Sequence, residues 1–425
     1  MDREQIHYLY RAGRWKDLID ACQNEDTASW SPWEYYYYSY GLRRTAQYAR
    51  GRAAAREGMI RFPDFIPLRG VYCWCLYYLY VRPFQGTGAQ WPDFCRAVDA
   101  ILTYSEQRED TPYEWAVWKM ADALKGRGSA AAERLYTYLK ALDPDKLSQK
   151  PIVHTTGKGV QIGPSPREQW YSQMSRVLIK RKEYDACIAL CEEGLRVFPE
   201  LHYDNDVWLS YRISLCRLHL GHVDEAAAGF QALLRYHQHW ILYRGLFYTA
   251  VAGNQRTDAL KYGSAAMLAA GAYSSKVNLL VELADVLSQK RADARWAYGH
   301  LLLAKQIRQQ QGWRVPEAVQ KKLAVYPEQS LTEDALLAKL KPFWLTHKHW
   351  GETERQGGIA SVLPNGAGFV REYGGRSYYF SPESLWHGPA ETGMAVRFFV
   401  EIGQDGVDGQ ASCRAVDLRP QEELF

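Results

Sequence analysis

Residues 168–199, EQWYSQMSRVLIKRKEYDACIALCEEGLRVFP, contain two amphipathic segments with helical spacing of their apolar side chains, separated near Lys182. The second segment ends at Phe198-Pro199, where proline prevents the helix from continuing. The same ending closes residues 57–63 (EGMIRFP), and a third version closes residues 136–144 (YTYLKALDP). A helix pair that recurs in this way predicts an all-α repeat architecture for most of the chain.

This segment resembles a tetratricopeptide repeat, which is a pair of packed helices. Tyr184–Ile188 (YDACI) matches the tyrosine–acid–alanine junction of the family, with Cys187 in place of the alanine. Gly194 and Pro199 match the last small residue and the closing proline of the motif. Small residues recur in the family where two helices must approach closely, which makes the match fairly specific.

The small residue of the junction returns along the chain. Cys187, Ala226 and Ala259 are 39 and 33 residues apart, close to the period of ~34 residues that is typical of the family. Weaker copies are centred on Ala132 and Ala297, so the resemblance covers about the first 310 residues, in about seven repeats. It implies a TPR-like α-solenoid, because each helix pair buries its apolar face only by stacking on its neighbours.

In such solenoids the first helices of the pairs line a concave groove, and the resemblance implies that a partner binds there. The groove residues occupy the second, fifth, ninth, twelfth and thirteenth positions of a repeat. Tyrosine and arginine at these positions suit a peptide or a strand of nucleic acid, whereas the alternative is that the tyrosines fill the core. The predicted groove residues are Tyr36, Tyr40, Arg43, Arg44, Arg176, Lys180, Tyr211, Arg244 and Tyr248.

The sixth position of the repeats argues against one class of partner. Tetratricopeptide domains that clamp the C-terminal carboxylate of a chaperone carry asparagine at this position. In this chain the position is occupied by Tyr37, Trp118, Gln173, Arg212 and Gly245.

Arginines are concentrated in one stretch of the first repeats, where the only opposing charge is that of Glu57. Such a run is either a solvated helix face or a stripe that contacts phosphates, and the sequence leaves both interpretations open. The run consists of Arg43, Arg44, Arg50, Arg52, Arg56 and Arg61.

From about Arg355 the pattern changes to period-two alternation with glycine turns, which predicts short strands. Five such strands within ~65 residues suit a five-stranded OB-type barrel. They are expected at residues 358–362, 368–371, 377–380, 395–400 and 410–416.

Residues 357–418 resemble a cold-shock domain. Asn365–Val370 (NGAGFV) stands at the first ribonucleoprotein motif of that family, and Ser377–Phe380 (SYYF) stands near the second. Ser381–Leu385 and Gly393–Phe398 match the turn and the strand that follow. Because the family stacks bases of single-stranded nucleic acid on aromatic rings of its second and third strands, the resemblance implies such a site here.

The aromatic surface of this barrel is smaller than that of the family. Ala367 replaces the first aromatic residue of the motif and Asn365 its lysine, while Ser361–Leu363 replace the Trp-Phe-Asn of the first strand. Alternation places neighbouring tyrosines on opposite faces of a strand, and we predict that Tyr378 shares the exposed face with Phe369. The predicted nucleic-acid-binding residues are Phe369, Tyr378, Tyr379 and Arg371.

The predicted domain organisation has five parts. A helix is expected at Leu331–Leu340 with Thr332 as its N-cap, and an aromatic and basic connector from Pro342 onward. The expected parts are repeats in 1–148, an irregular Gly-, Pro- and Thr-rich loop in 149–167, repeats in 168–312, the helix and connector in 313–354, and the barrel in 355–420.

Composition narrows the class of protein. The 425 residues are 47% hydrophobic and 14% aromatic, unlike a disordered chain, and no apolar run reaches the ~20 residues that span a membrane. The N-terminus does not resemble a secretory signal, and the eight cysteines lack the spacing of a disulfide framework. We therefore expect a cytoplasmic protein with reduced thiols and no membrane partner.

The net charge of +4 is unevenly distributed, because residues 351–425 carry −5 and the remaining residues carry +9. An acidic barrel attracts phosphates weakly.

No catalytic or metal-binding pattern is recognisable. Cys73-x-Cys75 and the pair Cys187/Cys191 have no further ligands at zinc spacing. The sequence contains no Ser/His/Asp series, paired-carboxylate signature or Gly-rich dinucleotide turn. We therefore predict no catalytic residues, no metal and no cofactor.

These features predict a non-enzymatic adaptor. Its groove binds a protein or nucleic-acid partner, and its barrel binds single-stranded nucleic acid, RNA rather than DNA. Similar combinations of repeats and small nucleic-acid modules occur in anti-phage and other bacterial conflict systems, which suggests that setting by analogy. The alternatives are a pure protein–protein scaffold with a degenerate barrel that binds no nucleic acid, and an enzyme with an unrecognised site.

Overall fold

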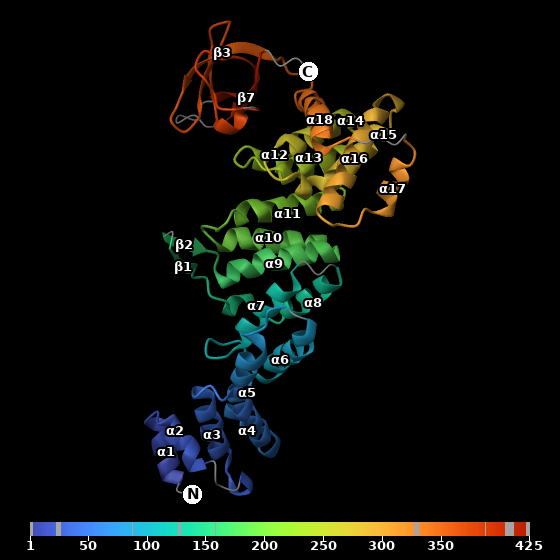
Figure 1. Ribbon diagram of the computed structural model, residues 1–425. Coiled ribbons are helices and arrows are strands. Elements are labelled where there is room, and N and C mark those ends of the chain that lie inside the picture. Colours follow the sequence, from blue (N-terminus) through green and yellow to red (C-terminus); the bar gives the residue numbers. More distant parts are fainter. Residues whose placement is uncertain are drawn as a thin grey trace. The chain divides into compact units, whose positions relative to one another are not determined.

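The computed structural model contains eighteen α-helices, a two-stranded hairpin and a closed five-stranded barrel among the residues that it describes (Figure 1). The predicted fold class, a TPR-like helical-repeat solenoid followed by a small all-β five-stranded barrel, is confirmed. The chain divides into two compact units, Met1–Arg212 and Ile213–Phe425. The described residues are 3–22, 27–86, 88–125, 129–157, 159–326, 331–386, 388–403 and 412–421.

In the first unit, each helix from the first to the ninth packs against the next one along the chain. The helices are α1 (Arg3–Arg11), α2 (Trp15–Cys22), α3 (Pro32–Arg44), α4 (Tyr48–Arg61), α5 (Pro67–Leu76), α6 (Trp91–Tyr104), α7 (Tyr113–Leu124), α8 (Ser129–Lys140), α9 (Pro166–Arg181) and α10 (Tyr184–Val197). The boundary after Arg212 falls within the next helix, α11 (Asn205–His219). Polar caps define where helices begin. The Ser165 hydroxyl, for example, accepts a hydrogen bond of 3.2 Å from the N–H of Glu168 at the start of α9.

Small side chains allow neighbouring helices to approach closely. A Cβ atom at Gly58 would lie 2.8 Å from side-chain atoms of Leu68 and Tyr35, so any larger residue there would force the helices apart. The junction residues that the repeat pattern picks out, Cys187, Ala226 and Ala259, are all buried.

Residues 149–167, expected to form an irregular loop, instead contain a β-hairpin. Strand β1 (Ile152–Thr156) pairs antiparallel with β2 (Gly159–Gly163). The apolar side chains of the hairpin, such as Val153 and Val160, are more than half exposed. Because neither face is buried in a core, the alternation that normally identifies a strand is weak in the sequence.

The second unit begins with further helices and ends in the barrel. Its helices are α12 (Val223–Leu234), α13 (Trp240–Ala252), α14 (Arg256–Leu268), α15 (Val277–Ser288), α16 (Ala294–Gln310), α17 (Glu317–Leu323) and α18 (Glu333–Lys348). The predicted cap of α18 is confirmed, since the Thr332 hydroxyl accepts a hydrogen bond of 3.3 Å from the N–H of Ala335.

The prediction that a connector begins at Pro342 is wrong for residues 342–348. These residues belong to α18, which continues through the proline. A proline removes one helical hydrogen bond and usually ends or kinks a helix. Here the following residues Phe343, Trp344 and Leu345 are all buried, and burial of three large apolar side chains outweighs that loss.

The barrel closes in the strand order β3-β4-β5-β7-β6, with the pair β5 and β7 parallel and all other neighbours antiparallel. The strands are β3 (Arg355–Val362), β4 (Gly368–Glu372), β5 (Ser377–Phe380), β6 (Ala395–Gly403) and β7 (Ser412–Pro420). Residues 410 and 411 of the predicted fifth strand lie outside the described residues. Alternate residues fill the barrel core, namely Ile359, Val370, Tyr378, Phe380, Val396, Phe398, Ala415 and Leu418.

A largely buried carboxylate joins the barrel to α18. Asp417, on β7, receives hydrogen bonds at one oxygen from the Lys348 ammonium and from His349 Nε2, the latter at 2.7 Å. Its other oxygen accepts a hydrogen bond of 3.0 Å from the Trp386 indole N–H. The His349 ring also stacks on Phe399 with centroids 3.8 Å apart. We call the contacts of Lys348 and His349 with Asp417 the barrel joint.

The thiols are almost all enclosed. All eight cysteines lie among the described residues, seven of them are buried, and Cys413 on β7 is exposed. Burial raises the pKa of both Cys73 and Cys75 to about 12. No helix in the described part of the chain is both long enough and apolar enough to cross a membrane.

Candidate functional site

The outer surface of the barrel carries two aromatic rings side by side. Phe369 on β4 and Tyr379 on β5 stand directly opposite each other in the strand register, and their ring centroids are 5.8 Å apart. Each side chain is about 40% exposed, with values of 40% and 41%. Two neighbouring exposed rings on one face provide a surface on which unpaired bases can stack.

The prediction that Tyr378 shares this face is wrong. Tyr378 is 4% exposed and packs in the barrel core opposite Val370. Its hydroxyl donates a hydrogen bond of 3.2 Å to Glu372 and accepts one of 2.9 Å from Arg355. Alternation along the strand holds, but the pairing register places Tyr379, rather than Tyr378, beside Phe369.

One cation accompanies the two rings. Arg371 follows Phe369 by two residues on β4, so it extends from the same face, and it is exposed. Tyr379 is also paired in register with Arg414 of the parallel strand β7, whose guanidinium lies 3.5 Å from Glu401. We call Phe369, Arg371 and Tyr379 the barrel face.

The predicted groove residues of the first helices lie together. The Tyr36 and Tyr10 hydroxyl oxygens are 3.3 Å apart, and burial together with that hydrogen bond raises the pKa of Tyr36. The guanidinium of Arg43 lies 4.6 Å from the centroid of Tyr40, and Arg44 remains exposed. These tyrosines are half-buried in a shared aromatic cluster, which explains part of the tyrosine enrichment as core packing.

The basic run of α3 and α4 mainly contacts neighbouring elements. Arg52 donates a hydrogen bond of 2.8 Å to the Tyr80 hydroxyl, and Arg61 donates one of 2.8 Å to the Thr27 carbonyl. Such contacts favour a structural role for these two arginines over a free stripe for phosphates.

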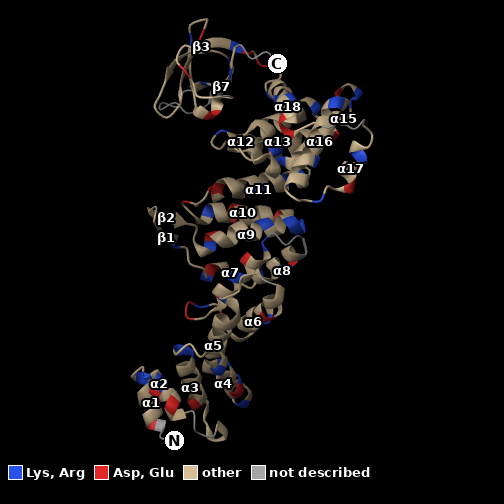
Figure 2. Ribbon diagram, viewed as in Figure 1, with Lys and Arg blue, Asp and Glu red and all other residues tan. Residues whose placement is uncertain are grey.

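Arg176 and Lys180 lie on the same face of α9, where two adjoining cavities of about 380 and 210 Å³ open. Lys125, Gln173 and Arg176 line both cavities, and no Asp or Glu is among the residues that line them. The hairpin forms a wall of the larger cavity through Ile152, His154 and Gly163. We call the two together the α9 cavity; Lys and Arg of α9 are blue in Figure 2.

A buried arginine near the α9 cavity was not predicted as a site residue. Arg212 on α11 is 6% exposed, and its Nη1 atom has no hydrogen-bond partner among the described residues. Burial, with the nearby positive charge of Arg176, lowers the pKa of Arg212 to about 10. In the sequence it appears only as an unusual occupant of the sixth repeat position.

The remaining predicted groove residues make contacts of their own. Tyr211 is buried. In the second unit, the Arg244 guanidinium lies 5.6 Å from the centroid of Tyr248, whose hydroxyl donates a hydrogen bond of 3.1 Å to Glu282. Burial raises the pKa of Glu282. Arg244 and Tyr248 are therefore close together, as the groove pattern predicts for residues four apart on a helix.

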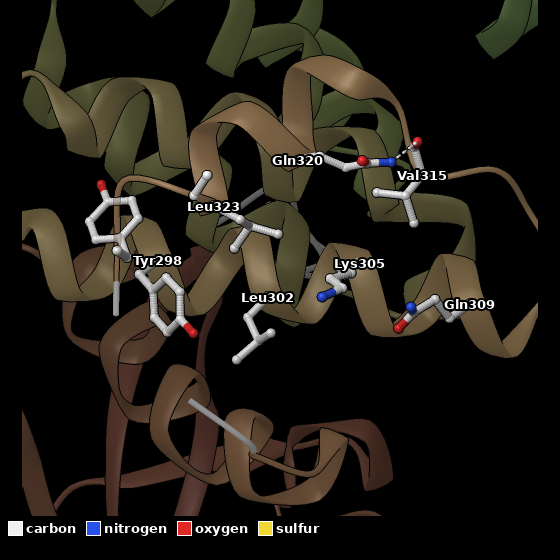
Figure 3. Close-up of a pocket in the computed structure, with 9 residues that line it drawn as sticks. Tyr298, Leu302, Lys305, Gln309, Val315, Gln320 and Leu323 are labelled. Carbon is white, nitrogen blue, oxygen red and sulfur yellow. Dashed lines mark hydrogen bonds between the residues drawn. The ribbon is translucent and has the colours of Figure 1, made fainter. Parts of the chain in front are cut away.

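Other cavities of the second unit differ in charge. A cavity of about 610 Å³ lies between α16 and α17 and is lined by apolar and neutral polar side chains, with Lys305 as its one charged residue (Figure 3). Another, of about 900 Å³, lies between α18 and the barrel, where Arg419 is already bonded to Glu354. Among the described residues, no group of three or more His, Cys, Asp or Glu side chains is placed to hold a metal ion.

No protein-family model matches the sequence, and no curated protein is a significant match. Solved structures similar to the chain include MamA from Desulfovibrio magneticus RS-1, with 14% identity and a TM-score of 0.30 over 47% of this chain and 96% of that chain. The C-terminal part of a TPR repeat-containing protein from Cytophaga hutchinsonii has 11% identity and a TM-score of 0.29 over 76% and 99%. A human IFIT1 dimer with m7Gppp-AAAA has 11% identity and a TM-score of 0.37 over 81% and 75%. At identities this low, no residue role transfers to this chain.

Proposed function

We propose that the protein is a non-enzymatic adaptor whose barrel face binds single-stranded nucleic acid, RNA in preference to DNA, and whose helical repeats bind a partner. The observation that carries the proposal is the exposed pair Phe369 and Tyr379 with Arg371 on the same face. Side chains of this size are normally turned into the core of so small a barrel. Their exposure at the strands where OB-type folds bind single strands supports a role in stacking bases.

The helical part of the proposal concerns the partner. Groove-forming repeat arrays are a common architecture for binding proteins, and the pairing of such an array with a small barrel suits a bridge between a partner and a nucleic acid. By the same architectural analogy, we place the protein in a bacterial defence setting, with a cytoplasmic location. Co-purified protein and nucleic acid, identified by mass spectrometry and by sequencing, test this part directly.

Replacing both rings of the barrel face, Phe369→Ala with Tyr379→Ala, is expected to weaken binding of oligouridine by the full-length protein by about thirtyfold or more. Each lost stacking contact costs about 1–3 kcal/mol. Fluorescence polarisation with a labelled oligouridine at low salt measures the change, since low salt maximises the accompanying phosphate attraction.

The matched control is Tyr236→Ala, because Tyr236 is an aromatic residue of the second unit that is 81% exposed and lies between α12 and α13, outside the barrel. Its removal is expected to leave the affinity unchanged. If the intact protein binds neither oligouridine nor oligothymidine at low salt, the barrel is a docking module and the pure scaffold becomes the better description.

A further inference from the structure

The α9 cavity differs from an ordinary charged surface because its cations outnumber its acids. Arg176, Lys180 and Lys125 line it, and Arg212 lies buried close enough for its charge to interact with that of Arg176. Of these, Lys125 forms an exposed ion pair of 2.6 Å with Asp122. Two neighbouring arginines without an acid between them repel each other unless an anion joins them.

The buried acid at the start of α9 already has hydrogen-bond donors of its own. Glu168, in the first turn of α9, is 2% exposed and accepts hydrogen bonds from His202 N–H at 2.7 Å and from the Asn205 amide at 2.8 Å. His202 Nδ1 lies a further 2.9 Å from the same carboxylate. These donors orient Glu168 toward the loop before α11, so its carboxylate is committed to donors other than Arg176 and Arg212.

Arg212 supplies the second, independent observation. A guanidinium that is 6% exposed with an unbonded Nη1 atom is costly, because a buried charge normally has a partner. A buried polar atom without a partner calls for an explanation, and a bound anion is one that suits a guanidinium. Arg176 next to it supplies a second fork of N–H donors.

The other lining residues indicate the kind of anion. Gln169, Ser172 and Gln173 lie on the same face of α9 as Arg176 and offer neutral hydrogen-bonding groups, while Trp208 offers an aromatic surface. A terminal phosphate carries close to two negative charges and three acceptor oxygens. A ligand with this charge matches two arginines and a lysine better than a ligand with a single carboxylate. An indole beside the phosphate suits a base rather than a peptide side chain.

We propose that the α9 cavity binds the phosphorylated end of a nucleic-acid strand, with Arg176 on the phosphate, the charge of the buried Arg212 behind it, and Trp208 against the terminal base. The proposal rests on the proposed function in that the ligand is a nucleic acid, but it uses residues of the first unit, separate from the barrel face. The hairpin β1–β2, an insertion between two helix pairs, supplies the wall that turns this part of the groove into a pocket.

The test compares full-length protein bound to oligouridines that carry a 5′-phosphate, a 3′-phosphate or hydroxyls at both ends, with uridine monophosphate and inorganic phosphate as competitors. One of the two phosphorylated strands is expected to bind about tenfold tighter than the unphosphorylated strand, as one charge-assisted contact provides. Competition by the free nucleotide, beyond that of inorganic phosphate, identifies the contribution of the base.

Arg176→Gln is expected to abolish the roughly tenfold preference for the phosphorylated end. Arg176 is exposed, so its substitution preserves the fold; Lys180→Gln provides a second exposed variant with a partial loss. The control Arg96→Gln removes an exposed arginine of α6 that does not line the cavity, and it is expected to retain the preference.

Two results would overturn this assignment. Equal binding of all three oligouridines shows that the cavity does not read a terminal phosphate. Stronger competition by a phosphopeptide than by uridine monophosphate shows that the ligand is a protein. The double variant of Phe369 and Tyr379 distinguishes failure here from failure of the barrel, because it is expected to lower overall affinity and to keep the preference for a phosphorylated end.

Discussion

Replacing Trp344 by alanine is expected to destabilise the second unit by about 3–5 kcal/mol, which is the usual cost of removing a large buried aromatic side chain. Trp344 on α18 is 0% exposed, and its indole N–H donates a hydrogen bond of 2.8 Å to His300 Nε2. The opposite ring nitrogen, His300 Nδ1, lies 2.7 Å from the Trp296 carbonyl. The alanine variant therefore leaves both a void and an unsatisfied imidazole nitrogen.

Urea denaturation followed by circular dichroism measures this loss as a lower midpoint. Trp344→Phe keeps most of the ring volume and removes the donor, so it is expected to cost about 1–3 kcal/mol. Trp350→Ala removes a tryptophan that is 58% exposed two residues beyond the end of the same helix, and a change below about 1 kcal/mol is expected. A loss for Trp344→Ala as small as for Trp350→Ala would show that α18 does not pack as described.

Asp417→Asn is expected to destabilise the second unit by about 3–5 kcal/mol by breaking the barrel joint, because it leaves the buried Lys348 ammonium with less compensating charge. Burial alone would raise the pKa of Asp417, but the charge of Lys348 and the hydrogen bonds from His349, Lys348 and Trp386 outweigh it and lower the pKa. Asparagine is the appropriate substitution because residue 417 has a φ of 51°, which asparagine tolerates better than alanine.

The pH dependence has a definite sign. Because the pKa of Asp417 is lower in the folded protein than its usual unfolded value of about 3.9, its contribution is fully present above that value and is lost as the pH falls below it. The buried His300 acts at higher pH, because burial lowers its pKa in the folded protein to about 4. Between about pH 6.5 and pH 4 the imidazole is protonated only in the unfolded chain, so the free energy of unfolding decreases as the pH falls through this range.

Urea midpoints measured between pH 7 and pH 2.5 separate these two groups. In Asp417→Asn, the decrease of the urea midpoint below about pH 4 is expected to be lost. The decrease at higher pH that is caused by His300 is expected to remain. The control Asp285→Asn breaks an ion pair with Lys322 whose side chains are about half exposed, so a loss below about 1 kcal/mol is expected. Equal losses in the two variants would contradict the buried joint.

Local sequence patterns predicted the repeats and the barrel because both depend on periodic burial. The small residues of the helix junctions, such as Cys187, stand where the structure brings two helices together. The alternation of Ser377–Phe380 also predicted that adjacent tyrosines face opposite ways. It could not choose between Tyr378 and Tyr379, because that depends on the pairing register with β4, which local alternation does not specify.

The parts that sequence reasoning missed depend on contacts between distant segments. Pro342 normally predicts a helix boundary, and only the burial of the side chains after it explains why α18 continues. Arg212 has no distinctive neighbours in the sequence, and its significance comes from the position of Arg176, 36 residues earlier. Unpaired buried charge is a property of the fold that no local pattern reports.

The distribution of thiols makes the native protein ready for spectroscopic labelling. With seven cysteines buried and Cys413 exposed, and with the pKa of both Cys73 and Cys75 raised to about 12, a maleimide dye reacts selectively at Cys413, since the thiolate is the nucleophile. That residue directly precedes Arg414, the register partner of Tyr379. A fluorophore placed there without any mutation reports on its surroundings at the edge of the barrel face, so strand binding can be followed in real time on the unmodified sequence.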